Sequence, residues 1–152
     1  MKAAPGIFYH TDIEIEGEEL DYSVACLSLG PSSAIGGLTA LFYYRVTEEA
    51  PHQIWVLVPK RTRGWNPRYR CLRTIASLAT EIENNRNYRI VTLERALLEG
   101  LRYSTKIGLE VALSATRKAL HQKLTTIAKL ESAGKRLRLT QVLLKYWEAI
   151  IA

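Results

Sequence analysis

Apolar and polar positions alternate in the first part of the chain, and this pattern predicts strands. Residues 7–16 follow the period-two pattern of a half-buried strand. Residues 22–29 and 38–46 are rich in β-forming side chains and predict two more strands. Residues 54–58 are apolar at every position, as in a central strand that is covered on both faces. With glycine-rich and proline-containing turns between them, these segments predict an antiparallel meander of four strands.

Beyond residue 58 the apolar positions follow a helical period. Residues 67–84 place their apolar side chains on one side, which predicts an amphipathic helix packed on the sheet. Asn66 is a good N-cap and Pro67 suits the first helical position. Asn84 and Asn85 tolerate the left-handed conformation that ends many helices, so the helix is predicted to end there.

The last part of the chain predicts a short fifth strand and further helices. Residues 88–92 form the strand, and Thr92 then caps a helix with Glu94 in its first turn. Residues 101–113 alternate like a strand, but strong helix formers flank them on both sides. A helix is therefore favoured there, and a strand remains the alternative. Gly134 is predicted to end this stretch, and residues 137–151 form the last helix.

These elements predict a single α+β domain over residues 1–152. An N-terminal antiparallel sheet of four to five strands is covered by about three C-terminal helices. Charge changes at the same boundary. Residues 1–58 hold two basic and eight acidic side chains, whereas residues 59–152 hold 19 basic and 7 acidic ones. The domain is thus divided into an acidic β part and a basic, mainly helical part.

The overall composition is that of an ordinary globular protein, with 47% hydrophobic and 24% charged residues. No apolar run reaches the length that spans a membrane, so we expect a cytoplasmic protein without a membrane partner. Cys26 and Cys71 are expected to be reduced. His10, His52 and His121 lack the spacing of a zinc site. The sequence predicts no metal, cofactor or catalytic residue.

The most informative segment for function is residues 60–73, which contain six cations and no acidic residue. The predicted anion-binding residues are Lys60, Arg61, Arg63, Trp65, Arg68, Tyr69, Arg70 and Arg73. Cations neutralise phosphates, and aromatic rings stack on unpaired bases. The predicted helix start at Asn66 would add free N–H groups. A solvated basic loop is the alternative interpretation.

Two other charged regions bear on possible partners. A second basic stretch predicts an exposed helical face, and it comprises Arg117, Lys118, Lys123, Lys129, Lys135, Arg136 and Arg138. Acidic residues gather at the predicted tip of the first hairpin, and they are Glu14, Glu16, Glu18, Glu19 and Asp21. Such a tip repels phosphate but suits the basic part of another copy.

Taken together, these features favour a non-enzymatic protein that binds or associates with nucleic acid, either DNA or RNA. The first alternative is a protein–protein interaction module or subunit, which uses its divided charge to bind an acidic protein or to form a homo-oligomer. The second alternative is a small enzyme of unknown reaction that uses His10 or His121.

Overall fold

The computed structural model describes residues 2–4, 7–8, 17–64 and 66–152, and it has a mixed α+β fold around a five-stranded sheet. The strands are β3 (Ala34–Ile35), β4 (Trp55–Pro59), β5 (Arg70–Thr74), β6 (Ile82–Asn84) and β7 (Arg89–Val91). Their order is β5-β4-β3-β7-β6, so β5 and β6 are the edges. A separate two-stranded pair consists of β1 (Lys2–Ala4) and β2 (Ile7–Phe8).

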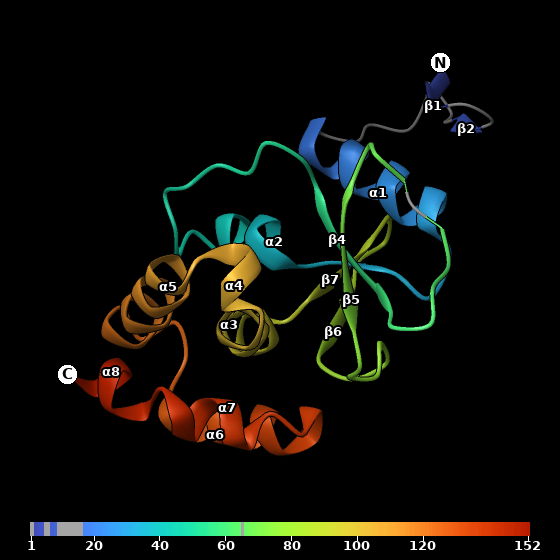
Figure 1. The fold of residues 1–152 in the computed structure, drawn as a ribbon. Helices are drawn as coiled ribbons and strands as arrows, with labels where there is room; N and C mark the ends of the chain where they lie inside the picture. Colours follow the sequence, from blue (N-terminus) through green and yellow to red (C-terminus); the bar gives the residue numbers. More distant parts are fainter. Residues whose placement is uncertain (1, 5–6, 9–16, 65) are drawn as a thin grey trace.

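Helices cover both faces of the five-stranded sheet (Figure 1). One face carries α1 (Gly17–Leu29), and the other carries α2 (Gly37–Tyr43) and α3 (Leu93–Arg102). The short α4 (Ser104–Ile107) leads from α3 to α5 (Leu109–His121), which packs on α3. An outer layer against α3 and α5 is formed by α6 (Ile127–Leu137), α7 (Thr140–Lys145) and α8 (Trp147–Ile151).

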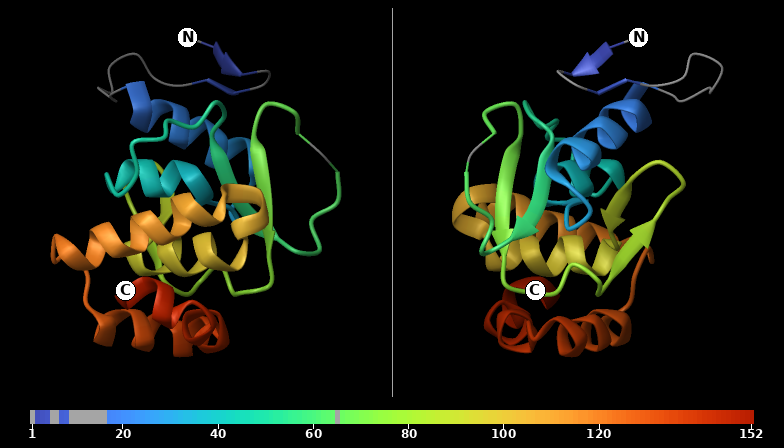
Figure 2. Two further views of the ribbon diagram at one scale, coloured as in Figure 1. Left: turned by 60° about the vertical axis from the view of Figure 1, so that its left-hand side comes forward. Right: turned by 90° about the vertical axis from the view of Figure 1, so that its right-hand side faces the viewer.

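The prediction of an antiparallel meander is wrong, because the sheet is mixed and its strands are not all N-terminal. The β3–β4 and β6–β7 pairs are antiparallel, whereas β4–β5 and β3–β7 are parallel. Two parallel neighbours need a connection that returns along the sheet. Between β4 and β5 this return is the loop 60–69, which stands out beside the edge strand (Figure 2).

Two predicted strands in the first part of the chain are helices. Residues 22–29 belong to α1, where Tyr22, Ala25 and Cys26 are buried at helical spacing. Residues 38–43 of the predicted third strand belong to α2. Both segments are mostly apolar, so periodicity alone does not distinguish a buried helix from a buried strand. By contrast, the predicted strand at 54–58 is confirmed as β4, whose first four residues are buried.

The sharp turn from β3 into α2 depends on two glycines. A Cβ at Gly36 would lie 1.8 Å from Leu57 Cδ1, inside van der Waals contact. Gly37 has φ +54°, and a Cβ there would lie 2.6 Å from the Trp55 ring. Only glycine allows the chain to pass this close to β4 in that conformation. The glycine pair therefore places α2 directly against the strand that leads to the basic segment.

The predicted helix at residues 67–84 is also wrong, since this segment contains β5, a loop and β6. In β5, exposed Arg70 and Arg73 flank buried Leu72, and Thr74 is buried as well. The pairing of all five β5 residues with β4 satisfies one side of the strand. Asn84 is the last residue of β6, and the Asn85 N–H donates to the Tyr88 carbonyl in the β6–β7 hairpin, so neither asparagine ends a helix.

The predictions for residues 88–151 agree better with the structure than those for the first part of the chain. The strand at 88–92 is confirmed as β7, and Thr92 caps α3 by accepting a hydrogen bond from the Arg95 N–H. The helical interpretation of residues 101–113 is confirmed by α3, α4 and α5. Gly134, however, is buried inside α6 and does not end it. The last helix is two short helices, α7 and α8, separated at Tyr146.

The predicted acidic hairpin is only partly described. Glu14 and Glu16 lie outside the described residues. Glu18, Glu19 and Asp21 belong to α1, and all three are exposed. The acidic side chains thus mark the beginning of a helix, where they favour its dipole. Among the described residues, no helix is both long enough and apolar enough to cross a membrane.

Candidate anion-binding site

The six predicted cations gather at one edge of the sheet. Lys60 and Arg61 follow β4, Arg63 and Arg68 lie in the loop 60–69, and Arg70 and Arg73 belong to β5. All six residues are exposed. We refer to these six residues as the basic edge. Their proximity arises because β5 pairs in parallel with β4, so the connecting loop must run back along the same edge.

The predicted helix start at Asn66 is a turn that leads directly into β5. Asn66 Oδ1 accepts a hydrogen bond from the Arg68 N–H at 3.1 Å, and the Asn66 carbonyl accepts from the Tyr69 N–H at 3.2 Å. Asparagine commonly forms such local turns, which compete with a helix. The basic edge therefore offers its side chains to a ligand, and no helix begins at Asn66.

Of the two aromatic residues that were predicted to contact a ligand, the structure describes Tyr69 only. Tyr69 is only 6% exposed and lies in the core, so its ring offers little surface to a base. Trp65 lies outside the described residues. Trp55 is a further aromatic residue near the basic edge, but the Arg70 guanidinium lies 5.3 Å from its ring centroid. Trp55 is itself only 8% exposed, so its ring also offers little surface to a base.

Arg73 braces the loop of the basic edge. Its Nε donates to the Thr62 carbonyl at 3.2 Å, and its Nη2 donates to the Gly64 carbonyl at 2.8 Å. The guanidinium therefore holds the return loop beside β5 and keeps its positive charge at the surface. This contact fixes the backbone next to Arg63 and reduces the conformational entropy that a ligand would otherwise have to remove.

The charge of the basic edge is not compensated by the residues that the structure describes. Two salt bridges occur in this part of the chain, between Arg95 and Glu99 and between Arg136 and Glu81. Neither involves the basic edge. The six cations therefore create a positive field that attracts anions and repels other cations.

A cleft opens where β4 and β5 end. It has a volume of about 590 Å³, and Lys60 and Arg61 are the charged residues among the described ones that line it. The facing wall is the segment 75–81, which follows β5 and contributes Ser77 and Leu78. Ligands of sheets with parallel strands commonly bind outside the carboxyl ends of those strands. We refer to this hollow as the basic cleft.

A buried arginine holds the segment 75–81 in place. Arg95 of α3 is fully buried, and its Nε donates to Glu99 Oε1 at 2.7 Å. Its other nitrogens donate to the carbonyls of Ala76, Ser77 and Thr80. Thr74 links this network to the sheet, because its hydroxyl donates to Glu99 Oε2 at 2.7 Å.

This network was not predicted from the sequence. The feature that could have indicated it is the spacing of Arg95 and Glu99, which places opposite charges on one helix face among leucines. Spacing does not show that such a pair is buried. The loop 75–81 was not predicted either, because the sequence pattern of residues 67–84 predicted a helix.

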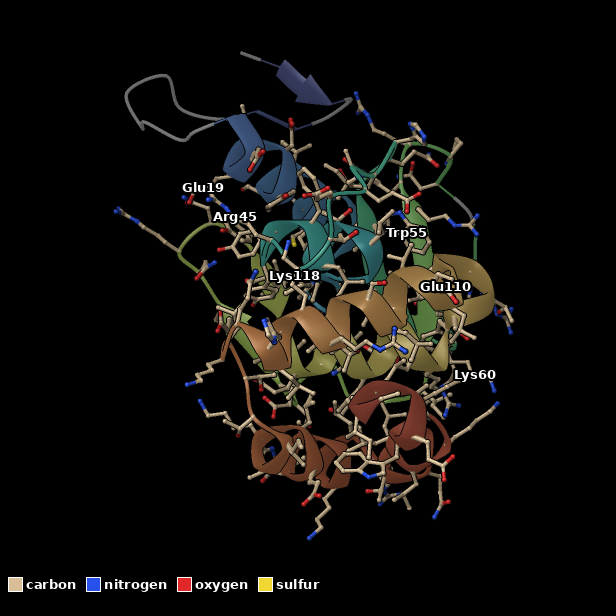
Figure 3. The ribbon with its side chains drawn as sticks, turned by 90° about the vertical axis from the view of Figure 1, so that its left-hand side faces the viewer. Glu19, Arg45, Trp55, Lys60, Glu110 and Lys118 are labelled. Atoms are coloured by element: carbon tan, nitrogen blue, oxygen red, sulfur yellow. The ribbon has the colours of Figure 1, made fainter. Side chains whose placement is uncertain are left out.

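A second hollow of about 800 Å³ lies between α1, α2 and Tyr88, and we refer to it as the tyrosine hollow. Side chains of both signs line it, and Figure 3 shows Glu19, Arg45 and Lys118 on the same side of the molecule. Tyr22 lies 6.2 Å from Tyr43 and 5.5 Å from Tyr88 between ring centroids.

The phenol groups of Tyr22 and Tyr88 stay neutral over a wide pH range. Burial raises the pKa of Tyr22 to about 12, and the nearby Glu18 carboxylate adds to this increase. Burial likewise raises the pKa of Tyr88, to which the hydrogen bond with Tyr43 contributes. Three carboxylates, those of Glu18, Glu19 and Glu48, line this hollow, so it is the poorer candidate for an anion.

The candidates for catalysis and metal binding are not brought together. His121 is exposed at the end of α5, and Arg117 donates to the Ala149 carbonyl, which anchors α8. His10 lies outside the described residues. Within the described ranges, no group of three histidine, cysteine, aspartate or glutamate side chains is arranged to hold a metal ion.

The second basic stretch is divided between several surfaces. Arg136 pairs with Glu81, and Lys118 lines the tyrosine hollow. Lys129 and Lys135 are exposed on α6.

A comparison with known protein families gives no match for this chain, and a comparison with curated proteins gives none either. The geometry of the basic edge and of the basic cleft is therefore what indicates a function for this chain.

Proposed function

We propose that this chain binds nucleic acid, DNA or RNA, through phosphate contacts made by the basic edge. The observation that carries the proposal is the line of six exposed cations along one sheet edge, without an acidic residue between 60 and 73. Lysine and arginine side chains that neutralise phosphates release counterions, and this release supplies most of non-specific affinity.

The surroundings of the basic edge favour binding that tolerates many sequences. Tyr69 and Trp55 are both buried, so neither ring serves as a stacking platform. Trp65 remains a predicted contact. Contacts to phosphates position a protein on nucleic acid but carry no sequence information. We therefore expect similar affinity for unrelated sequences of equal length.

Fluorescence anisotropy with labelled DNA and RNA oligonucleotides at two salt concentrations tests the proposal. Affinity should fall steeply as salt rises, because each phosphate contact releases counterions. The variant R63A/R68A/R70A removes three exposed cations of the basic edge. We expect at least a tenfold loss of affinity at low salt, and a salt slope reduced by about three.

The variant K106A/K129A/K135A is the matched control, because it removes the same charge from exposed helical positions. It should change affinity by less than about threefold if binding is local to the basic edge. Equal losses in both variants would show that net charge alone attracts the oligonucleotide. That result, or no binding of the unchanged protein at low salt, would overturn the proposal.

Self-association is the second candidate function, and the exposed acidic start of α1 favours it. Glu18, Glu19 and Asp21 form no salt bridge with any residue that the structure describes. The same chain therefore carries an uncompensated acidic surface and an uncompensated basic one. Sedimentation at low and high salt tests this candidate. A complex between copies that dissociates as salt rises supports it, and a monomer at low salt excludes it.

A further inference from the structure

Arg95 determines how the backbone of the segment 75–81 is oriented, because three carbonyl groups of this segment accept hydrogen bonds from its buried guanidinium. Arg95 Nη1 donates to the carbonyls of Ser77 and Thr80, and Nη2 donates to the Ala76 carbonyl at 3.4 Å. Three carbonyl oxygens of one short segment thus converge on one buried guanidinium. Buried charge of this kind requires such acceptors, because its desolvation is otherwise costly.

The same contacts determine where two N–H groups point. In a trans peptide the carbonyl and the N–H of the following residue point in opposite directions, and the described chain has no cis peptide. Because the Ala76 and Ser77 carbonyls face Arg95, the N–H groups of Ser77 and Leu78 face away from it. Both residues line the basic cleft.

These two N–H groups are available to a ligand. The N–H of Ala76 donates to Thr74 Oγ1, that of Ala79 to Ser77 Oγ, and that of Thr80 to the Ser77 carbonyl. The N–H groups of Ser77 and Leu78, by contrast, donate to no residue that the structure describes. Adjacent free N–H groups in a turn form a concave site for an anion.

The opposite side of the basic cleft supplies positive charge. Lys60 and Arg61 line it directly after β4, and the Lys60 N–H donates to the Thr74 carbonyl at 3.0 Å, which fixes the backbone there. Charge-assisted hydrogen bonds from lysine and arginine to phosphate are stronger than neutral ones. Apolar surface lies nearby, because Ile75 is 59% exposed and Leu78 also lines the cleft.

We infer that the basic cleft binds the terminal phosphate group of a nucleotide. The phosphate oxygens accept hydrogen bonds from the Ser77 and Leu78 N–H groups, and Lys60 and Arg61 balance the negative charge. The volume of about 590 Å³ accommodates the attached nucleoside, which contacts Ile75 and Leu78. The inference deepens the proposed function and rests on it where the phosphate belongs to the end of a nucleic-acid strand. A free mononucleotide offers the same chemistry.

Oligonucleotides of one sequence with a 5′-phosphate, a 3′-phosphate or two hydroxyl ends provide the test. We expect one phosphorylated form to bind at least tenfold more tightly than the hydroxyl form. In an NMR titration with adenosine 5′-monophosphate, the amide signals of Ser77 and Leu78 should shift, and adenosine should leave them in place. Equal affinity for all three oligonucleotides, together with unshifted amide signals, would overturn the inference.

Two variants of equal charge separate the cleft from the edge. K60A/R61A should remove the preference for the terminal phosphate, whereas R63A/R68A should weaken all oligonucleotides alike and retain the preference. Retention of the preference in K60A/R61A would contradict the inference. If no oligonucleotide binds but the mononucleotide shifts both amide signals, the proposed function fails and the cleft is assigned to a free nucleotide. If all oligonucleotides bind equally and no signal shifts, the proposed function stands and the cleft inference fails.

Discussion

The segment 75–81 separates two groups of cations with opposite surroundings. On its inner side, Arg95 is fully buried, and Glu99 and three carbonyls accept its hydrogen bonds. On its outer side lie Lys60 and Arg61, which together with the other cations of the basic edge are exposed and form no salt bridge with a described residue. A buried guanidinium with a full set of acceptors serves the fold, and an exposed one keeps its donors for an external anion. The number of cations in a sequence therefore overstates the charge that is available to a partner.

The largest expected effect comes from replacing an arginine by methionine, once on the buried side of this comparison and once on the exposed side. R95M leaves the Glu99 carboxylate buried without its partner and three carbonyls without a donor. We expect the free energy of unfolding to fall by about 3–5 kcal/mol. R63M, on the exposed side, should change it by less than about 0.5 kcal/mol. Urea denaturation followed by circular dichroism measures both values.

The double variant R95M/E99L serves as the control for R95M, because it removes both charges together. It should recover the part of the loss that comes from the unpaired carboxylate, since replacing a buried ion pair by apolar side chains is often close to neutral, whereas the three carbonyls still lack their donor. If R95M costs no more than R63M, the guanidinium is not the partner on which Glu99 depends, and the comparison fails.

Removal of the Thr74 hydroxyl is expected to have an intermediate effect. That hydroxyl donates to Glu99 Oε2 and accepts from the Ala76 N–H at 3.2 Å, so it joins the inner network to the segment 75–81. T74V leaves both groups without this partner and should lower the free energy of unfolding by about 1–3 kcal/mol. T74S retains the hydroxyl and should stay closer to the unchanged protein. Equal losses in T74V and T74S would assign the effect to packing.

Salt should act on the outer cations and hardly on the inner pair. In R63A/R68A/R70A, like charges no longer repel along the basic edge, so stability should rise slightly at low salt. We expect a gain below about 0.5 kcal/mol that disappears at high salt. The deficit of R95M should be the same at both salt concentrations, because buried charges are screened little. Urea denaturation at two salt concentrations would contradict the comparison if the R95M deficit shrank with salt.

The sequence predicted correctly those elements whose limits are marked by local chemistry. Thr92 marks the start of α3 because its side chain satisfies a helical N–H, and β4 is recognisable as a short, uniformly apolar run. The grouping of the six cations of the basic edge was also visible, since all of them lie within residues 60–73, and their role in binding stays a prediction. What decides their arrangement is the pairing of β5 with β4, which depends on distant residues.

The remaining elements could not be predicted because tertiary contacts decide them. Residues 22–29 of α1 and 38–43 of α2 are about as apolar as buried strands, and the close passage of Gly36 and Gly37 over β4 is set by Leu57 and Trp55. The walls of the basic cleft come from segments that are distant in sequence. The orientation of the Ser77 and Leu78 N–H groups depends on Arg95, which lies in a different element.

The last prediction concerns stability at high pH, to which the tyrosine hollow is expected to contribute and the inner network is not. The pKa of Tyr22 is raised from 10.0 to about 12 by burial and by Glu18. Between pH 10 and 12 the unfolded chain loses this proton before the folded chain does, so stability falls as pH rises. Arginine keeps its proton there, so the decline should be equally steep in R95M and shallower in Y22F. A decline that vanished in R95M would place a titrating group in the inner network and not in the tyrosine hollow.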